Sequence, residues 1–233
     1  MSSLATLSQS IPPFALPPGP LGAVLQIGEK LSGMTFEETR QAYEERSDFY
    51  ISAFPSISAT DPVDRDLIQA WAIAQTGPIL DVGCGPGHWT GWLHDQGLEI
   101  EGIDPVPAFI DRARLKHPQV RFRLGRAEAL GVETSSLAGI LAWFSLIHID
   151  PEQLGETFSE FARALRPGGG LCVGFFAGPA LAEFDHPVSK AYFWPVSRLE
   201  DVIERAGFSV TSTQLRQEPG VQNHAATLAV RNP

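Results

Sequence analysis

The sequence contains little cysteine, little positive charge and no long apolar run. Its 233 residues include two cysteines, Cys84 and Cys172, and both lie in apolar or glycine-rich segments. Neither their number nor their spacing indicates a disulfide framework or a metal site. The two thiols fit a reducing compartment, so we expect a cytoplasmic protein with no bound metal.

The charge balance and hydropathy exclude further classes. The 27 acidic residues outnumber the 17 basic residues, and the formal net charge is −10. Because such a surface repels phosphate backbones and no basic cluster is evident, we expect no nucleic-acid partner. No apolar run approaches the roughly 20 residues of a membrane helix. The N-terminus also lacks a basic region followed by an apolar stretch, so we expect neither membrane insertion nor secretion.

The chain is long enough for one α/β domain with a short extension. Residues 1–34 form a leader rich in proline, serine and glycine, which we expect to be extended or mobile. Thr35 and Glu38 form a T-x-x-E capping box that predicts a helix within a helical lid region at residues 35–60. Residues 61–233 make up the main domain.

Within this main domain, apolar segments alternate with amphipathic helices. We expect strands at residues 79–82, 100–103, 120–124, 139–144, 171–176, 208–215 and 227–231. Such alternation predicts a doubly wound, mostly parallel α/β sheet that is covered on both faces. The last two strands have no helix between them and should form an antiparallel hairpin at one edge.

Helix starts follow local capping signals. Asp61 precedes Pro62 and is the expected N-cap of the first domain helix. Asp150 is the expected N-cap of a helix that begins at Pro151, and Ser197 with Glu200 forms a second capping box. The segment at residues 184–195 joins the fifth strand to this last helix and carries an amphipathic aromatic cluster that a solvated loop would not need.

The most informative stretch is residues 79–90, where a buried strand runs into glycines and then into a helix. Glycines allow positive φ and close approach of a ligand, and in an open α/β sheet this turn lies at the ligand-binding edge. Aligning Gly83 and Gly85 with a dinucleotide fingerprint puts His88 where a small residue is needed. No lysine follows, which excludes a Walker-type phosphate loop.

Two acids accompany this turn. Asp81, two residues before the first glycine, suits a cationic amino group, either directly or by fixing the loop amides. Asp104 ends the second strand and can accept both hydrogen bonds of a ribose diol. An amino acid joined to a nucleoside would satisfy both acids. An NAD(P)-dependent oxidoreductase remains an alternative, against which the glycine spacing and His88 argue.

These motifs resemble a known family. The segments Asp81–Gly87, Phe144–His148 and Leu165–Gly169, together with Asp104, are similar to class I S-adenosylmethionine-dependent methyltransferases. The resemblance covers roughly residues 60–231 and is greatest to bacterial small-molecule members with a type-11-like methyltransferase domain. It implies a Rossmann-like, seven-stranded sheet with an antiparallel last strand, which agrees with the expected hairpin.

The resemblance also implies the cofactor and the reaction. Residues 61–233 would bind S-adenosyl-L-methionine and transfer its methyl group to an unidentified small molecule. A non-catalytic S-adenosylmethionine-binding protein stays open as an alternative. The implied cofactor-binding residues are Asp81, Gly83, Cys84, Gly85, Gly87, His88, Asp104, Pro105, Arg126, Ala127, Glu128, Phe144 and Ser145.

Within this set, each group would meet a different part of the cofactor. Gly83 to Gly85 would line the methionine portion, and the carbonyls of Phe144 and Ser145 would meet its amine. Residues Arg126 to Glu128 would flank the adenine. Family members often have aspartate at the position of Arg126, so the backbone amide of Ala127 could read the ring instead.

Candidate residues for the acceptor are aromatic or histidine. His148 follows the fourth strand and is the first candidate base; the alternative is that it packs the loop and donates to a backbone carbonyl, a common role for a neutral imidazole. His186 is a weaker candidate base. The residues proposed to bind the small-molecule substrate are Tyr43, Tyr50, His186, Tyr192 and Trp194. The aromatic cluster at residues 184–195 could instead cover the sheet edge or form a homodimer contact.

Overall fold

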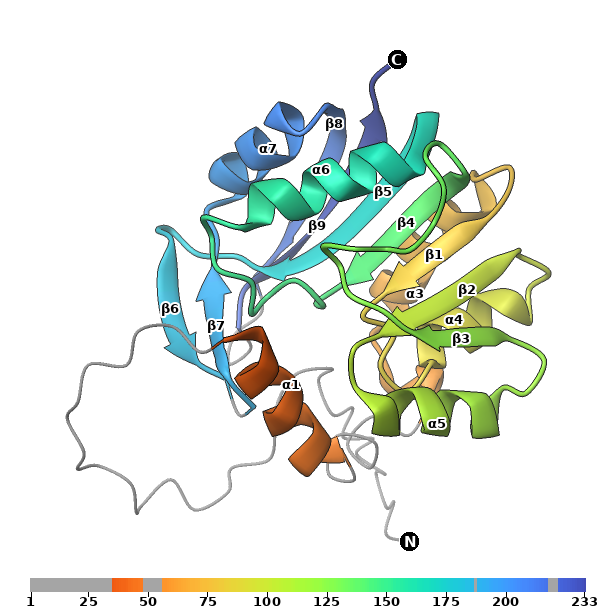
Figure 1. Ribbon diagram of the computed structural model, residues 1–233. Helices are drawn as coiled ribbons and strands as arrows, with labels where there is room; N and C mark the ends of the chain where they lie inside the picture. Colours follow the sequence, from red (N-terminus) through yellow and green to blue (C-terminus); the bar gives the residue numbers. More distant parts are fainter. Residues whose placement is uncertain (1–34, 48–55, 187, 218–221) are drawn as a thin grey trace, which may run out of the picture.

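The computed structural model describes residues 35–47, 56–186, 188–217 and 222–233 (Figure 1). The helices are α1 (Phe36–Glu45), the 3₁₀ helix η1 (Ile57–Ala59), α3 (Pro62–Ile73), α4 (His88–His94), α5 (Pro107–Lys116), α6 (Leu154–Ala164) and α7 (Val196–Arg205). The strands are β1 (Ile79–Val82), β2 (Ile100–Asp104), β3 (Arg121–Leu124), β4 (Leu137–Trp143), β5 (Leu165–Phe176), β6 (Ala182–Asp185), β7 (Lys190–Phe193), β8 (Phe208–Arg216) and β9 (His224–Arg231).

Seven of these strands form the main sheet, in the order β3-β2-β1-β4-β5-β9-β8. Strand β9 runs antiparallel to both β5 and β8, and the pairs among the first five strands are parallel. This confirms the doubly wound sheet with an antiparallel last strand. The terminal hairpin lies at one edge of the sheet, and β9 inserts between β5 and β8.

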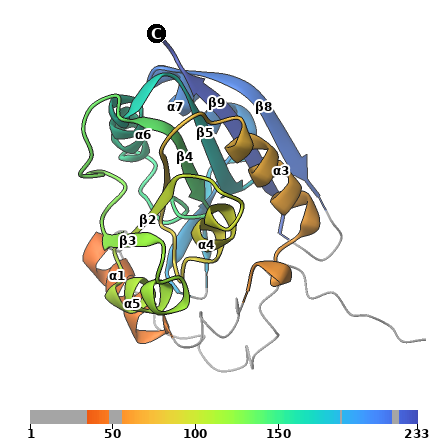
Figure 2. The ribbon, with the colours of Figure 1, turned by 90° about the vertical axis from the view of Figure 1, so that its right-hand side faces the viewer.

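Helices cover both faces of the sheet, as Figure 2 shows for α3 and α4 on one side and for α6 and α7 on the other. On the side that α6 and α7 cover, Phe158 and Phe161 of α6 are fully buried against the sheet. Ile68 and Trp71 of α3 pack with Leu93 of α4 on the opposite face. Burial on both faces explains why the central strands read as continuous apolar runs.

Two of the predicted helix starts are confirmed. The Thr35 hydroxyl accepts a hydrogen bond from the Glu38 amide at 3.3 Å, and the Glu38 carboxylate accepts one from the Thr35 amide at 2.6 Å. Asp61 accepts a hydrogen bond from the Val63 amide at 2.7 Å at the start of α3.

Two other predicted starts are wrong. Helix α7 begins after Pro195, so Ser197 lies inside its first turn, and the Glu200 carboxylate accepts a hydrogen bond from the Thr213 hydroxyl at 2.6 Å. Helix α6 begins at Leu154 instead of Pro151. Asp150 does accept a hydrogen bond from the Glu152 amide at 2.9 Å, but this bond closes the turn that precedes the helix.

The segment that connects β5 to α7 contains a two-stranded hairpin, β6–β7. The rings of Phe184 and Phe193 stack at 4.2 Å, and the Lys190 ammonium lies 2.9 Å from the Glu183 carboxylate. Both strands are four residues long and mix charged with apolar residues, so their sequence resembles that of a loop. Every helix in the described ranges is too short or too polar to cross a lipid bilayer.

Candidate cofactor and acceptor site

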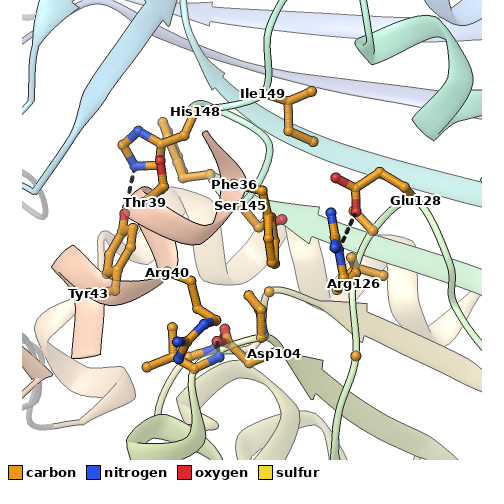
Figure 3. A pocket seen from close by; sticks show the side chains of 18 of the residues that line it. Phe36, Thr39, Arg40, Tyr43, Asp104, Arg126, Glu128, Ser145, His148 and Ile149 are labelled. Carbon is orange, nitrogen blue, oxygen red and sulfur yellow. Dashed lines mark hydrogen bonds and ion pairs between the residues drawn. The ribbon is translucent and has the colours of Figure 1, made fainter. Parts of the chain in front are cut away.

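A cavity of about 530 Å³ lies at the carboxyl ends of β1, β2 and β4, with α1 along one side (Figure 3). Its volume falls within the roughly 300–1,000 Å³ of typical small-molecule sites. Of the predicted residues, those that line it are Tyr43, Gly83, Gly85, Asp104, Pro105, Arg126, Ala127, Glu128, Phe144, Ser145, His148 and Tyr192. The sheet edge and α1 therefore bring most of the predicted site together.

The glycine turn forms the floor of this cavity. Gly83 has φ +70°, and a Cβ added there would lie 2.2 Å from the Cβ of Ser145. Gly85 has φ +54°, and a Cβ added there would meet nothing within 4 Å. The amides of Gly83 and Cys84 donate to the Ile103 carbonyl at 2.8 and 3.0 Å, which ties the turn to β2. The first glycine thus permits close packing on Ser145, and the second leaves open space beside the chain.

Asp104 is the buried acid of the cavity, with 5% of its surface exposed. Its Oδ2 accepts a hydrogen bond from the Gly85 amide and its Oδ1 accepts one from the Val106 amide, each at 2.9 Å. Burial raises the pKa of this carboxyl to about 6, and the two amide bonds oppose that rise. Because each carboxylate oxygen has a further lone pair, Asp104 is an oriented acceptor for a diol.

Asp81 does not line the cavity. Its Oδ2 accepts a hydrogen bond from the Thr90 hydroxyl at 2.6 Å, which anchors the end of β1 to α4. Burial raises the pKa of Asp81 to about 7, the bond from Thr90 lowers it, and the nearby charge of Asp104 raises it. By this geometry Asp81 fixes β1 against α4, the two elements on either side of the turn.

Three other predicted cofactor residues also lie away from the cavity. Cys84 packs in a cluster with Phe122, and a Cβ added at Gly87 would lie 2.8 Å from the ring of Phe122. His88 lies near Lys116, and burial lowers the pKa of its imidazole to about 4. In this left-handed turn, Gly83 and Gly85 face the cavity, whereas the residues between and after them face α5.

The segment after β4 contains a residue with an uncommon backbone conformation and a buried hydroxyl without a hydrogen bond. Phe144 adopts φ +54°, which is uncommon for a residue with a side chain. The buried Ser145 hydroxyl has no hydrogen-bond partner among the described residues. Such features concentrate at functional sites. Ser145 packs against Gly83, and both Ser145 and the open backbone at Gly85 line the cavity.

A charged pair lies at the other end of the cavity, after β3. The Arg126 Nε is 3.5 Å from the Glu128 Oε2. The same guanidinium lies 3.5 Å from the ring centroid of Phe36, the first residue of α1. Figure 3 shows the guanidinium between the Phe36 ring and the Glu128 carboxylate. This end of the cavity therefore joins the β3 loop to α1.

His148 also lines the cavity, and it links α1 to β7. Its Nδ1 is 2.5 Å from the Lys190 carbonyl oxygen, and its Nε2 is 2.7 Å from the Tyr43 hydroxyl (Figure 3). A carbonyl oxygen only accepts, so Nδ1 carries the hydrogen, and neutral Nε2 accepts a hydrogen bond from Tyr43. Burial lowers the pKa of His148 to about 4, which keeps the ring neutral at pH 7.

The remaining predicted acceptor residues are distributed differently. Tyr192 lines the cavity, whereas His186 and Trp194 do not. The His186 ring lies 5.1 Å from the ring of His148, and burial lowers its pKa to about 3. Trp194 is 3% exposed and packs in the main core. It forms a parallel β-bridge with Ala177, the residue that follows β5. Tyr50 lies outside the described residues.

Sequence reasoning missed most of the α1 contribution to the cavity. Phe36, Thr39 and Arg40 line it together with Tyr43. These residues occur at positions i, i+3, i+4 and i+7, which is the spacing of one helical face. That stripe could have identified them. Trp143, at the end of β4, also lines the cavity and had no distinguishing local signal.

Part of the chain is similar to known methyltransferases. Residues 79–169 match a family model described as a methyltransferase domain. An uncharacterized methyltransferase of Mycobacterium tuberculosis is 36% identical over 93 residues, which are 40% of this chain and 37% of that protein. A demethylmenaquinone methyltransferase of Beutenbergia cavernae is 29% identical over 107 residues, 46% of this chain and 44% of that protein.

A solved structure gives the same fold over more of the chain. It is 1,6-didemethyltoxoflavin-N1-methyltransferase from Burkholderia thailandensis with bound 1,6-didemethyltoxoflavin and S-adenosylhomocysteine. The TM-score is 0.67 at 20% identity, with 89% of this chain and 94% of that chain covered. The chain therefore has the fold of this methyltransferase structure, and its residues 79–169 are similar to a methyltransferase domain.

The curated matches are partial, since the chain spans 37% of the length of the Mycobacterium relative. The family-model match includes the glycine turn, Asp104, the β3 loop and His148. It leaves out α1 and the β6–β7 hairpin.

Proposed function

We propose that the protein is a methyltransferase that transfers the methyl group of S-adenosylmethionine to a small molecule. One observation carries this proposal: a single cavity of about 530 Å³ joins a nucleoside-binding edge to an end lined by aromatic residues and His148. A donor and an acceptor bound in the same cavity would be adjacent, which in-line transfer requires.

The residues at the sheet edge fit the cofactor. The Asp104 carboxylate is oriented by two backbone amides to accept hydrogen bonds from the ribose diol. The open backbone at Gly85 and the unpartnered Ser145 hydroxyl suit the amino acid portion. When bound, the cofactor supplies an electrophilic methyl group on a sulfonium.

The chain itself would align the acceptor and exclude water. Tyr43, Trp143 and Tyr192 line the end of the cavity that is proposed to hold the acceptor. Helix α1 lies along the same cavity. It is joined to β7 by the hydrogen bonds of His148 with the Tyr43 hydroxyl and the Lys190 carbonyl. The residue composition of this end suits a flat, largely apolar acceptor.

We propose His148 as the group that receives a proton when the acceptor nucleophile carries one. Its Nε2 is already bonded to Tyr43, so the proton would pass from the acceptor to the Tyr43 oxygen as the proton of Tyr43 moves to Nε2. A neutral O–H or N–H nucleophile becomes strongly acidic once methylated, and a weak base is then sufficient. His186, behind His148, would support the position of the ring.

The test uses the full chain with S-adenosylmethionine that carries a tritiated methyl group. Cell extract would be separated into small-molecule, protein and nucleic-acid fractions and incubated with the enzyme. The proposal predicts label in the small-molecule fraction and little label with Asp104→Asn. Label confined to protein or nucleic acid would contradict it. Binding of S-adenosylhomocysteine without any label transfer would favour the non-catalytic alternative.

Three further expectations accompany this proposal. The cytoplasmic location is compatible with Cys84 and Cys172, both of which are free and buried. The absence of a nucleic-acid partner is tested by the fractionation above. Homodimer formation is tested by light scattering of the purified chain.

A further inference from the structure

The hydrogen of the Tyr43 hydroxyl is already used at the end of the cavity that is proposed to bind the methyl acceptor. His148 Nδ1 lies 2.5 Å from the Lys190 carbonyl oxygen, which can only accept, so Nδ1 carries the ring hydrogen of the neutral imidazole. The Tyr43 hydroxyl, 2.7 Å from Nε2, therefore donates to His148. Tyr43 lines the cavity with its hydrogen directed at His148, so what it offers a ligand is its oxygen.

The Tyr192 hydroxyl on β7 is in a similar situation. Tyr192 pairs directly with Glu183 of β6 in the antiparallel hairpin, so the two side chains lie on the same face. Burial, the charges of Glu183 and Asp150, and a hydrogen bond to Glu183 all raise the pKa of the Tyr192 hydroxyl. Tyr192 lines the cavity, whereas Glu183 does not. The hydrogen of this second hydroxyl thus points out of the cavity, and its oxygen can accept a hydrogen bond from a ligand.

Asp150 supplies a third group of this kind. Its Oδ1 accepts a hydrogen bond from the Glu152 amide at 2.9 Å, and the exposed side chain lines the cavity where it meets solvent. An ionised carboxylate can only accept hydrogen bonds. The other carboxylates of the lining are engaged differently, since Asp104 is held by two backbone amides and Glu128 lies 3.5 Å from Arg126. Asp150 is therefore the carboxylate that faces the methyl acceptor.

The other polar side chains of α1 and of the segment after β4 do not reverse this pattern. Arg40 donates to Glu37 through Nε at 3.1 Å and through Nη2 at 2.5 Å. Figure 3 shows the Arg40 side chain extending from α1 away from His148. The Thr39 hydroxyl and the Gln153 amide can each donate and accept, so they favour neither kind of ligand. The end of the cavity near His148 thus presents mainly hydrogen-bond acceptors.

We propose that the methyl acceptor is an aromatic ring that carries at least two hydrogen-bond donors, hydroxyl or amino groups, and no carboxylate. Asp150 and Tyr192 are then the residues that determine this specificity. The inference rests on the proposed function, because it names the substrate class of the same site. One donor of the ring bonds to Asp150 and Tyr192, and another lies at the Tyr43 oxygen. A carboxylate on the ring would meet oxygen lone pairs and the negative charge of Asp150, which repels it.

The experiment is calorimetric titration of the full chain, saturated with S-adenosylhomocysteine, with naphthalene-2,3-diol and with 2-naphthoate. The two probes share one ring system, and they differ in carrying two donors or one carboxylate. The wild-type chain should bind the diol about tenfold more tightly, the scale of one hydrogen bond to a charged group. With tritiated S-adenosylmethionine, the diol should also take up label faster than 2-naphthoate.

Three variants test the residues that carry the specificity. Asp150→Asn keeps an oxygen for the Glu152 amide but adds a donor, so it should weaken the diol about tenfold and strengthen 2-naphthoate. Tyr192→Phe should weaken the diol about threefold and leave 2-naphthoate unchanged. Glu152→Gln is the matched control, because it removes the same charge from the same exposed turn without lining the cavity. It should change neither affinity by more than about twofold.

Each contrary outcome has a distinct meaning. Binding of 2-naphthoate as tightly as the diol, or failure of the diol to bind beside S-adenosylhomocysteine, would overturn the proposed substrate class alone. An equal change in Asp150→Asn and Glu152→Gln would overturn the role of Asp150, and an unchanged diol affinity in Tyr192→Phe would overturn that of Tyr192. Failure of the wild-type chain to bind S-adenosylhomocysteine at all would overturn the proposed function as well.

Discussion

The two ends of the cavity are built in different ways. The end proposed to bind the nucleoside (the nucleoside end) consists of turns that follow β1, β2 and β3, and its key bonds are between backbone amides and Asp104. The end proposed to bind the acceptor (the acceptor end) is assembled from α1, the segment after β4 and β7. There, Tyr43 and His148 are 105 positions apart in the chain, and His148 and Lys190 are 42 apart.

This difference follows in part the limits of the match to the methyltransferase domain. The nucleoside end lies within residues 79–169, the part that matches the family model. Both α1 and the β6–β7 hairpin lie outside it. Changes at the nucleoside end should therefore affect the fold or the cofactor, whereas changes at the acceptor end should leave cofactor binding nearly intact.

The largest expected effect is on stability at the glycine turn. Gly83→Ala places a Cβ 2.2 Å from the Cβ of Ser145 at φ +70° and should cost about 3 kcal/mol of unfolding free energy. Gly97→Ala is the matched control, because φ is +84° there but a Cβ would meet nothing within 4 Å. The control variant should lower the free energy of unfolding, measured in urea, by about 1 kcal/mol. Equal costs would show that Gly83 and Ser145 do not pack as described.

The next effect is on cofactor affinity. Asp104→Asn replaces an acceptor of two amide bonds and of the proposed diol bonds. We expect S-adenosylhomocysteine affinity to fall roughly 10- to 100-fold in calorimetry. Asp111→Asn, an exposed change on α5, serves as the control and should have no effect. An unchanged dissociation constant for Asp104→Asn would remove Asp104 from the site.

A pH effect of similar origin should follow. The pKa of Asp104 is raised from 3.8 to about 6, so the carboxyl gains a proton as pH falls through this value and loses acceptor capacity. Affinity should therefore drop about tenfold between pH 7 and pH 5, and Asp104→Asn should flatten this slope. Asp81, with a pKa of about 7, is present in both the wild-type chain and Asp104→Asn, so the difference between their slopes reports on Asp104.

The stability of the unliganded chain should change in the opposite direction with pH. A folded-state pKa above the unfolded value means that the folded chain holds the Asp104 proton more tightly between pH 3.8 and about 6. The contribution of Asp104 to stability is therefore lost as pH rises through this window. Thermal unfolding of the wild-type chain and Asp104→Asn across this range measures the contribution. Identical pH profiles would contradict the raised pKa.

The smallest effect is expected at the acceptor end. Tyr43→Phe removes the hydroxyl that donates a hydrogen bond to His148. It should lower the free energy of local opening of α1 by about 1 kcal/mol, so that hydrogen exchange of α1 is about fivefold faster. Gln41→Ala, on the exposed face of α1, is the control. S-adenosylhomocysteine affinity should stay within about twofold in both variants, because neither contacts the nucleoside end. A large loss in Tyr43→Phe would mean that the two ends are not independent.

Prediction from sequence succeeded where structure follows from adjacent residues. The strand–glycine–helix order predicts that Gly83 and Gly85 lie at the cavity, and the end of β2 predicts the same for Asp104. It does not fix the side-chain directions of Asp81, in β1, and Cys84, in the turn, and both of these side chains face away from the cavity.

Prediction was weaker where partners are distant in the chain. Tyr43 and His148 were each identified as candidates, but nothing local indicates that they bond to each other. The Ser197 capping box was a misleading local signal, because helix α7 begins after Pro195. The β6–β7 hairpin is stabilised by the Phe184–Phe193 stack, a pairing that neither four-residue strand reveals by itself.

The most direct test of the account is calorimetric titration of the full chain with S-adenosylhomocysteine, with NAD as the comparison. The account predicts micromolar binding of S-adenosylhomocysteine and no heat from NAD. Binding of NAD alone would contradict the assignment of the cavity and would favour an oxidoreductase.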